Sequence, residues 1–118
     1  MRNFKELKIW QRGIQIAKMV YEQLDRMPSN TKFELGSQMF KSAISVPSNI
    51  TEGSSRKSSK DYNRFLEIAL GSSFELETQL IILDEITSKK DQSIRDVLLQ
   101  VDEEQKMIMA FMKKVSHS

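Results

Sequence analysis

Apolar residues recur at intervals of three and four along most of the chain, and this spacing constrains the fold more than any other feature. The first recurrence comprises Leu7, Trp10, Ile14, Ala17, Tyr21 and Leu24. Such spacing places apolar side chains on one face of an α-helix, whereas no segment alternates with the period of two that indicates a strand. The sequence therefore predicts an all-α fold, with helices at about 5–27, 31–56, 59–87 and 91–115.

The connections between these helices are short and polar. Pro28 should end the first helix, and Thr31 with Glu34 has the capping-box spacing that starts a second one. Short connections favour antiparallel neighbours, because a parallel neighbour requires a long crossover. A chain of 118 residues also fits one domain. We therefore expect residues 1–118 to form a single antiparallel, up-down-up-down four-helix bundle.

The segment around Pro47 contains residues that a helix interior tolerates badly. Pro47 lacks a backbone N–H and its ring collides with the carbonyl one turn earlier, so it should kink the second helix. Asn49 is expected to hydrogen-bond the backbone groups that the proline frees. Glu52 and Arg64 flank the turn between the second and third helices and are expected to pair. Gly71 is interpreted as a point where another helix backbone approaches closely.

Composition argues against several kinds of site. The chain has no cysteine, which removes disulfides and thiolate metal sites. Its one histidine, His117, lies in the terminal tail, so a Ser-His relay has no support, and the Glu-x-x-His pattern of di-iron bundles is absent. No apolar run approaches bilayer length, and the N-terminus lacks the apolar core of a signal peptide. We expect a cytoplasmic protein with no catalytic residue, metal, cofactor or membrane partner.

Positive charge is concentrated in the first half of the chain. Residues 1–60 contain 11 Lys and Arg against 5 Asp and Glu, whereas residues 61–118 contain 7 against 11, for a net charge of +2. Phosphate contacts need cations rather than precise geometry, so basic residues of the first half are candidate nucleic-acid contacts, although a solvated helix face is the ordinary alternative. The candidates are Lys5, Lys8, Arg12, Lys41, Arg56, Lys57 and Lys60.

A composite of residues in the first three predicted helices identifies a family resemblance. It consists of Trp10, Gln38, Ser45-Val46-Pro47-Ser48-Asn49-Ile50-Thr51-Glu52-Gly53, Tyr62, Arg64-Phe65-Leu66, Ala69, Gly71-Ser72 and Glu75-Leu76. The composite resembles the bacterial 23S rRNA intervening-sequence protein family, also called the four-helix bundle protein family. The resemblance implies a four-helix bundle without enzymatic activity. It extends to accessory variability proteins of diversity-generating retroelements, which implies a homopentamer that binds nucleic acid and associates with a reverse transcriptase.

Two functions follow from these observations. The first is a homo-oligomer, a pentamer by the resemblance, that binds RNA or DNA non-specifically through a basic surface. One departure weakens it, because the family favours two arginines near Lys41-Ser42, where this chain has one basic residue. The alternative is a protein–protein adaptor or scaffold, for example for a reverse-transcriptase-like partner.

The helices also carry more apolar residues than one interior requires, and the surplus should line a subunit interface. The surplus comprises Ile9, Ile16, Val20, Ile81, Ile82 and Met109.

Overall fold

The computed structural model describes residues 3–118, which form helices and short connections without any strand. In chain order the elements are η1 (Phe4–Glu6), α1 (Lys8–Leu24), α2 (Ser29–Thr31), η2 (Lys32–Gly36), α3 (Ser37–Ser54), α4 (Ser59–Ile86) and α5 (Gln92–Ser116). The predicted all-α fold with four long helices is confirmed. The first helix begins later than predicted because Leu7 has an extended backbone, with ψ at 129°, that separates the 3-10 turn η1 from α1.

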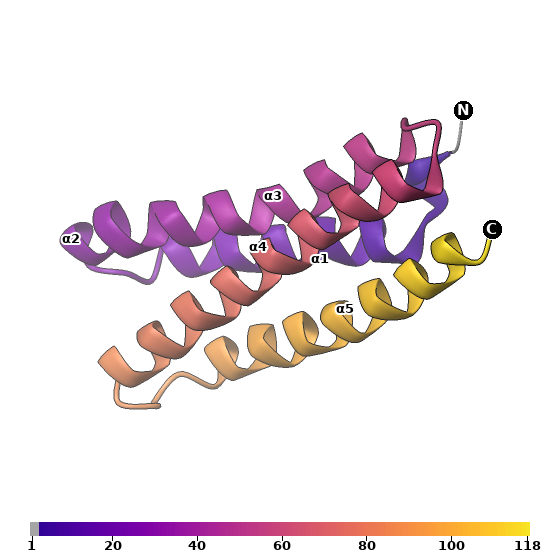
Figure 1. The fold of residues 1–118 in the computed structure, drawn as a ribbon. Coiled ribbons are helices and arrows are strands. Elements are labelled where there is room, and N and C mark those ends of the chain that lie inside the picture. The colour runs from indigo at the N-terminus through magenta and orange to yellow at the C-terminus, as the bar shows by residue number, and fades with distance from the viewer. Residues whose placement is uncertain (1–2) are drawn as a thin grey trace.

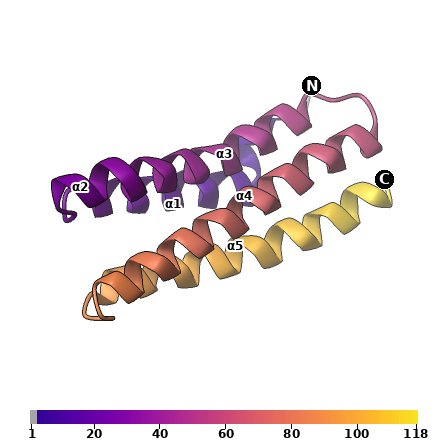
Figure 2. The same ribbon diagram turned by 60° about the vertical axis from the view of Figure 1, so that its left-hand side comes forward.

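The four long helices surround a common core as an elongated bundle of 45 × 21 × 20 Å. Helix α1 packs against α3 and α5, and α4 packs against the same two helices. The α1/α3 side of the bundle therefore lies opposite the α4/α5 side. Both termini lie at one end, next to the connection between α3 and α4 (Figures 1 and 2). None of the helices formed by residues 3–118 combines the length and the hydropathy needed to cross a membrane.

The buried core consists of two apolar clusters with a polar layer between them. Val20, Met39, Leu80 and Val97 belong to the first cluster. The second cluster comprises Ile9, Val46, Ile50, Tyr62, Leu66, Ala69, Ile108 and Val115. On α1, α4 and α5 the buried residues between the clusters are small or polar: Gly13, Ser72, Ser73, Glu104 and Gln105. This layer therefore separates the two apolar clusters. Its polar groups are costly to bury unless they are hydrogen-bonded.

Helix α1 turns a different face to the core than the one predicted. Ile14 and Tyr21 are 45% and 57% exposed, so the predicted recurrence through them was wrong as a core face. The core face instead includes Ile9, Ile16 and Val20, which corrects their assignment as surplus interface residues. Ile81, Ile82 and Met109, from the same predicted set, are between 42% and 47% exposed. The helix has two apolar stripes, and its core stripe passes through a glycine that a search for large apolar residues overlooks.

Candidate functional site

Basic residues from three parts of the chain lie at the end of the bundle that holds both termini. Turn η1 packs on α3 and α1, and the side chain of Asn63, near the start of α4, donates to the carbonyl of Met112 and the hydroxyl of Ser116 on α5. We call this region the basic end. Its cationic residues are Lys5, Lys8, Arg56, Lys57, Lys60, Arg64, Lys113 and Lys114. Five of the seven predicted nucleic-acid contacts are among them, and Lys113 and Lys114 were not part of the sequence-based prediction.

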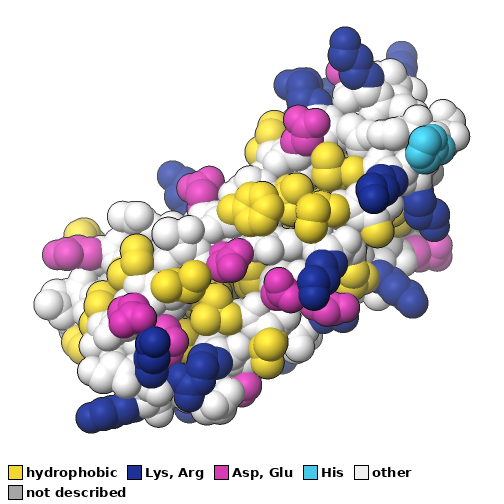
Figure 3. Space-filling view, turned by 60° about the horizontal axis from the view of Figure 1, so that its bottom comes forward, with side chains coloured by type: hydrophobic (Ala, Val, Ile, Leu, Met, Phe, Trp, Pro, Cys, Tyr) yellow, Lys and Arg dark blue, Asp and Glu magenta, His cyan; other side chains and the backbone are white. Residues whose placement is uncertain are grey.

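The two ends of the bundle differ in how far their charges are neutralised. At the opposite end, most cations are in ion pairs: Arg26 with Asp91, Lys32 with Asp25, Lys89 with Glu85 and Arg95 with Asp84. At the basic end, within the described residues, only Arg56 is in an ion pair, with Glu52 at 3.3 Å. Figure 3 shows Lys and Arg side chains at both ends of the molecule, with acidic side chains among them at each end. The basic end therefore has more basic than acidic residues, and most of its cations form no ion pair within residues 3–118.

The remaining two predicted contacts lie away from the basic end. Arg12 is partly buried on α1, where its guanidinium donates a hydrogen bond to the side-chain oxygen of Gln100 on α5. Its charge also acts on the buried carboxyl of Glu104. Arg12 is thus engaged within the bundle and is a poor candidate for a phosphate contact. Lys41 is exposed on α3 and lines a hollow between α3 and α4.

The predicted ion pair between Glu52 and Arg64 is not the one that the structure forms. Glu52 pairs with Arg56, one helical turn further on, because residues four apart lie on the same helix face. The guanidinium of Arg64 lies 4.8 Å from the centre of the Phe65 ring, and that of Arg56 lies 4.6 Å from it. Cation–π contact therefore accounts for the position of Arg64.

The side chain of Asn49 does not bond the carbonyl that the proline frees. Helix α3 continues unbroken through Pro47, and the carbonyl that loses its usual N–H partner belongs to Ala43, four residues earlier. The Asn49 amide instead donates to the carbonyl of Ser45 at 2.8 Å and to its hydroxyl at 3.0 Å. Asn49 thus orients Ser45, which shares a hydrogen bond with Ser72 on α4.

Gly71 is not the close-approach point that was predicted. A Cβ placed on it would have no neighbouring atom within 4 Å. Gly53 occupies such a point instead, since a Cβ there would lie 3.0 Å from side-chain atoms of both Tyr62 and Phe65. The close contact at Gly53 joins α3 and α4, and the sequence-based prediction had placed such a contact at the wrong glycine.

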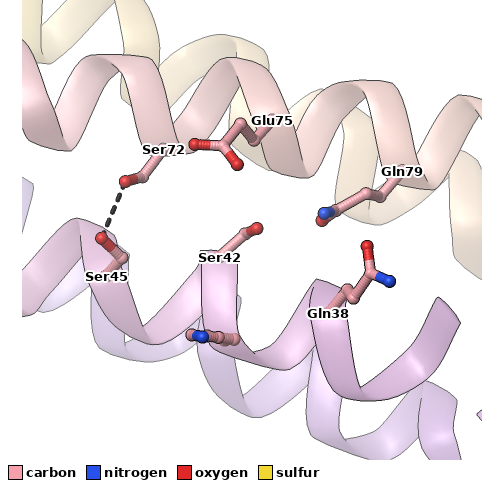
Figure 4. Close-up of a pocket in the computed structure, with 7 residues that line it drawn as sticks. Gln38, Ser42, Ser45, Ser72, Glu75 and Gln79 are labelled. Atoms are coloured by element: carbon pink, nitrogen blue, oxygen red, sulfur yellow. Dashed lines mark hydrogen bonds between the residues drawn. The ribbon is translucent and has the colours of Figure 1, made fainter. Parts of the chain in front are cut away.

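Three pairs of polar side chains face each other across the seam between α3 and α4, and we call the space that they line the polar hollow. Figure 4 shows the pairs in order: Ser45 opposite Ser72, Ser42 opposite Glu75, and Gln38 opposite Gln79. Only the first pair is joined by a hydrogen bond, with 2.7 Å between the hydroxyl oxygens. With Lys41 these residues line a hollow of about 390 Å³. The sequence contained a signal for it, because the polar residues on each helix are spaced by three and four, as core residues are.

A second polar feature is internal and consists of the Glu104 carboxyl in the layer between the apolar clusters. Glu104 is 1% exposed, and neither of its carboxyl oxygens has a hydrogen-bond partner among the described residues. Burial raises the pKa of Glu104 to about 8, against a smaller lowering by the charge of Arg12. Residues 3–118 contain no group of three or more His, Asp or Glu side chains that could hold a metal ion. Glu104 is therefore a buried acid that has no hydrogen-bond partner among the described residues.

Comparisons with known proteins agree with the sequence resemblance and the helical fold. The family model described as 23S rRNA-intervening sequence protein matches residues 5–110. A solved structure of a protein of unknown function from the S23 ribosomal protein family, from Bacteroides thetaiotaomicron, matches this fold with a TM-score of 0.81. The two chains are 21% identical, and the match covers 89% of this chain and 98% of the other. Among curated proteins none matches. The match to the family model spans most of the chain, and the protein belongs to the 23S rRNA-intervening sequence protein family.

Proposed function

We infer that this protein is a noncatalytic homo-oligomer that binds RNA or DNA with little sequence preference through its basic end. The observation that carries the proposal is the unequal neutralisation of the two ends: ion pairs occupy most cations at one end and leave most of them free at the other. Lysines that converge from separate segments and have no ion pair among the described residues suit the phosphate backbone, because such contacts need charge more than fixed geometry. The name of the matching family is consistent with an association with RNA.

Self-association is supported by apolar side chains exposed on two opposite sides of the bundle. On the α1/α3 side these are Ile14, Tyr21 and Ile44, each at least 43% exposed. On the α4/α5 side they include Phe74 and Ile81, at 47% each, and Figure 3 shows hydrophobic side chains gathered along this face. Two different stripes on opposite sides suit a heterologous, head-to-tail contact, which forms a ring when the rotation between neighbouring subunits closes. The number of five subunits rests on the family resemblance alone.

We also infer the finer order of the helices. The connections after Ser54 and Ile86 are short, and both termini lie at one end of the bundle (Figure 2). These features support an antiparallel, up-down-up-down arrangement. A bend of α3 at Pro47 is supported by the missing N–H at that position.

The proposed binding is tested by fluorescence anisotropy with single-stranded and duplex oligonucleotides at low and moderate salt. We expect affinity to fall steeply with salt, and the variant Lys57→Ala/Lys60→Ala to reduce the slope of log K against log salt by about two. The matched control is Lys89→Ala/Lys90→Ala, which removes two lysines at the opposite end and should change the slope little.

Absence of binding to any oligonucleotide at low salt would contradict the proposal. In that case the adaptor function becomes the better explanation. It predicts that a protein partner, such as a reverse-transcriptase-like polymerase, is recovered with the protein after nuclease treatment.

A further inference from the structure

The polar hollow between α3 and α4 is lined by a free cation and by a free hydrogen-bond acceptor. Lys41 comes from α3 and Glu75 from α4, and both line the hollow. Within residues 3–118, neither side chain forms an ion pair or a hydrogen bond with another residue. Both are exposed, so both are accessible to a ligand that lies along the seam.

A carboxylate beside a phosphate-binding lysine limits which nucleic acid backbone can be accommodated. Lys41 attracts a phosphate, whereas Glu75 repels phosphates and can interact favourably only with a hydrogen-bond donor. The backbone of DNA offers acceptors alone. Each ribose of RNA adds a 2′-hydroxyl, which can donate, and this group is what allows a protein to distinguish RNA from DNA.

The other side chains of the hollow suit a hydroxyl group for the same reason. Gln38 and Gln79 each present an acceptor oxygen and two N–H donors, and a hydroxyl can satisfy either kind of group. In Figure 4 their amide groups lie on facing sides of the hollow, with Ser42 one turn along α3 from Gln38. No aromatic side chain lines the hollow, so stacking of a base is not favoured there, and the lining is matched to sugar and phosphate.

We propose that the polar hollow binds the ribose–phosphate backbone of RNA, with Lys41 on a phosphate and Glu75 accepting a hydrogen bond from a 2′-hydroxyl. This proposal rests on the proposed nucleic-acid binding and specifies its ligand as RNA in preference to DNA. The distance along α3 from Lys41 to Ser54 is roughly 20 Å at 1.5 Å per residue. A strand that follows α3 therefore runs from the hollow to the basic end.

The test compares three labelled single strands of one sequence, made of RNA, DNA and 2′-O-methyl RNA, by anisotropy at one salt concentration. The 2′-O-methyl strand keeps the ribose, but its 2′ oxygen carries a methyl group and can no longer donate a hydrogen bond. We expect wild-type protein to bind RNA about tenfold more tightly than either other strand, as one hydrogen bond to a charged acceptor allows. Glu75→Ala should bring the three affinities close together, partly by strengthening DNA binding, because a charge that repels phosphate is removed.

Three further variants make the result specific. Lys41→Ala should weaken binding of all three strands by a similar factor, since it removes a phosphate contact only. Glu67→Ala, another exposed acid on α4, should leave the ratio of RNA to DNA affinity unchanged. Glu75→Gln keeps an acceptor oxygen in a side chain of the same shape, so it should retain part of the preference even if the alanine variant folds poorly.

The possible outcomes separate this proposal from the one on which it rests. Equal affinity for RNA and DNA overturns the RNA preference while leaving nucleic-acid binding intact. Equal affinity for RNA and 2′-O-methyl RNA also overturns it, because the preference would then come from strand shape. Failure to bind any strand overturns the proposed function, and the RNA preference with it.

Discussion

Gly13 and Pro47 are in direct contact across the α1/α3 interface: a Cβ added to Gly13 would lie 3.2 Å from the Cβ of Pro47. It would also lie 3.3 Å from Oε2 of the buried Glu104. The proline ring is rigid and is itself buried on α3, so it cannot move aside as a flexible side chain would. The absence of a side chain at Gly13 is thus what allows α1 to lie this close to α3.

Gly13→Ala should lower the stability of the folded protein. Alanine in a helix interior is ordinarily worth up to about 1 kcal/mol over glycine. At Gly13 this gain is opposed by overpacking against the proline ring, which costs about 1–3 kcal/mol. We expect a net loss of free energy of unfolding, measured by urea denaturation. A more stable variant would show that α1 can shift away from α3 at little cost.

Gly71→Ala is the matched substitution with the opposite expected sign. A Cβ at Gly71 meets no atom within 4 Å, so only the helix propensity changes. The free energy of unfolding should rise by about 0.5–1 kcal/mol in the same urea assay. In an oligomer, destabilisation by this alanine would indicate that a second subunit covers Gly71.

The stability of the protein should fall as pH rises from about 4.5 to about 8. The Glu104 carboxyl of the unfolded chain ionises near the ordinary pKa of 4.5, whereas burial raises the pKa of the folded carboxyl to about 8. Between these values the folded state binds more protons than the unfolded state, so the free energy of unfolding decreases with increasing pH. Above the folded pKa the carboxyl is ionised in both states and contributes no further change.

Glu104→Gln isolates that contribution. The amide cannot ionise, so the variant should show a flatter dependence of stability on pH and should exceed the wild type by about 1–3 kcal/mol at pH 8. Glu103→Gln, which changes the exposed neighbour, is the control and should leave the dependence as it is. Parallel curves for wild type and Glu104→Gln would mean that Glu104 is already ionised in the folded state.

Self-association should depend on both exposed apolar stripes. Light scattering should give a mass that is a multiple of 13.7 kDa. Phe74→Glu on one side, or Tyr21→Glu on the other, should each shift the protein toward the monomer, because a head-to-tail contact uses both surfaces. Phe33→Glu, at an 83% exposed position outside both stripes, should not. A wild-type mass of one chain would refute the oligomer.

The helices were predictable from the sequence because each has an apolar recurrence long enough to outweigh its local irregularities. Buried apolar residues of α3, α4 and α5, such as Met39, Leu66 and Val101, fall at the same spacing. The face of α1 did not, since it carries two apolar stripes and the choice between them depends on what Gly13 contacts. The spacing of apolar residues along α1 contains no information about how closely α3 packs against it.

The candidate site was only partly predictable for a related reason. Lysines at the basic end were identifiable by type, but which of them are free depends on ion pairs such as Arg26–Asp91, between residues 65 positions apart. Glu104 falls between Val101 and Ile108 at the spacing of the core residues, so the sequence shows an acid at a core position. Its burial and its lack of a hydrogen-bond partner among the described residues are known only from the structure. The polar hollow exists only once α3 and α4 are paired in register.

The polar layer between the two apolar clusters also determines how the helices are aligned lengthwise. Both clusters are built largely of aliphatic side chains, so burial of apolar surface alone does not fix the position of α5 along its neighbours. A shift of α5 by one turn would move the Glu104 carboxyl away from the positive charge of Arg12 and from the space beside Gly13 into one of the apolar clusters, where burial of the carboxyl would cost more. The buried Glu104 carboxyl, which fits beside Gly13 because that residue has no side chain, thus favours a single lengthwise alignment of the helices.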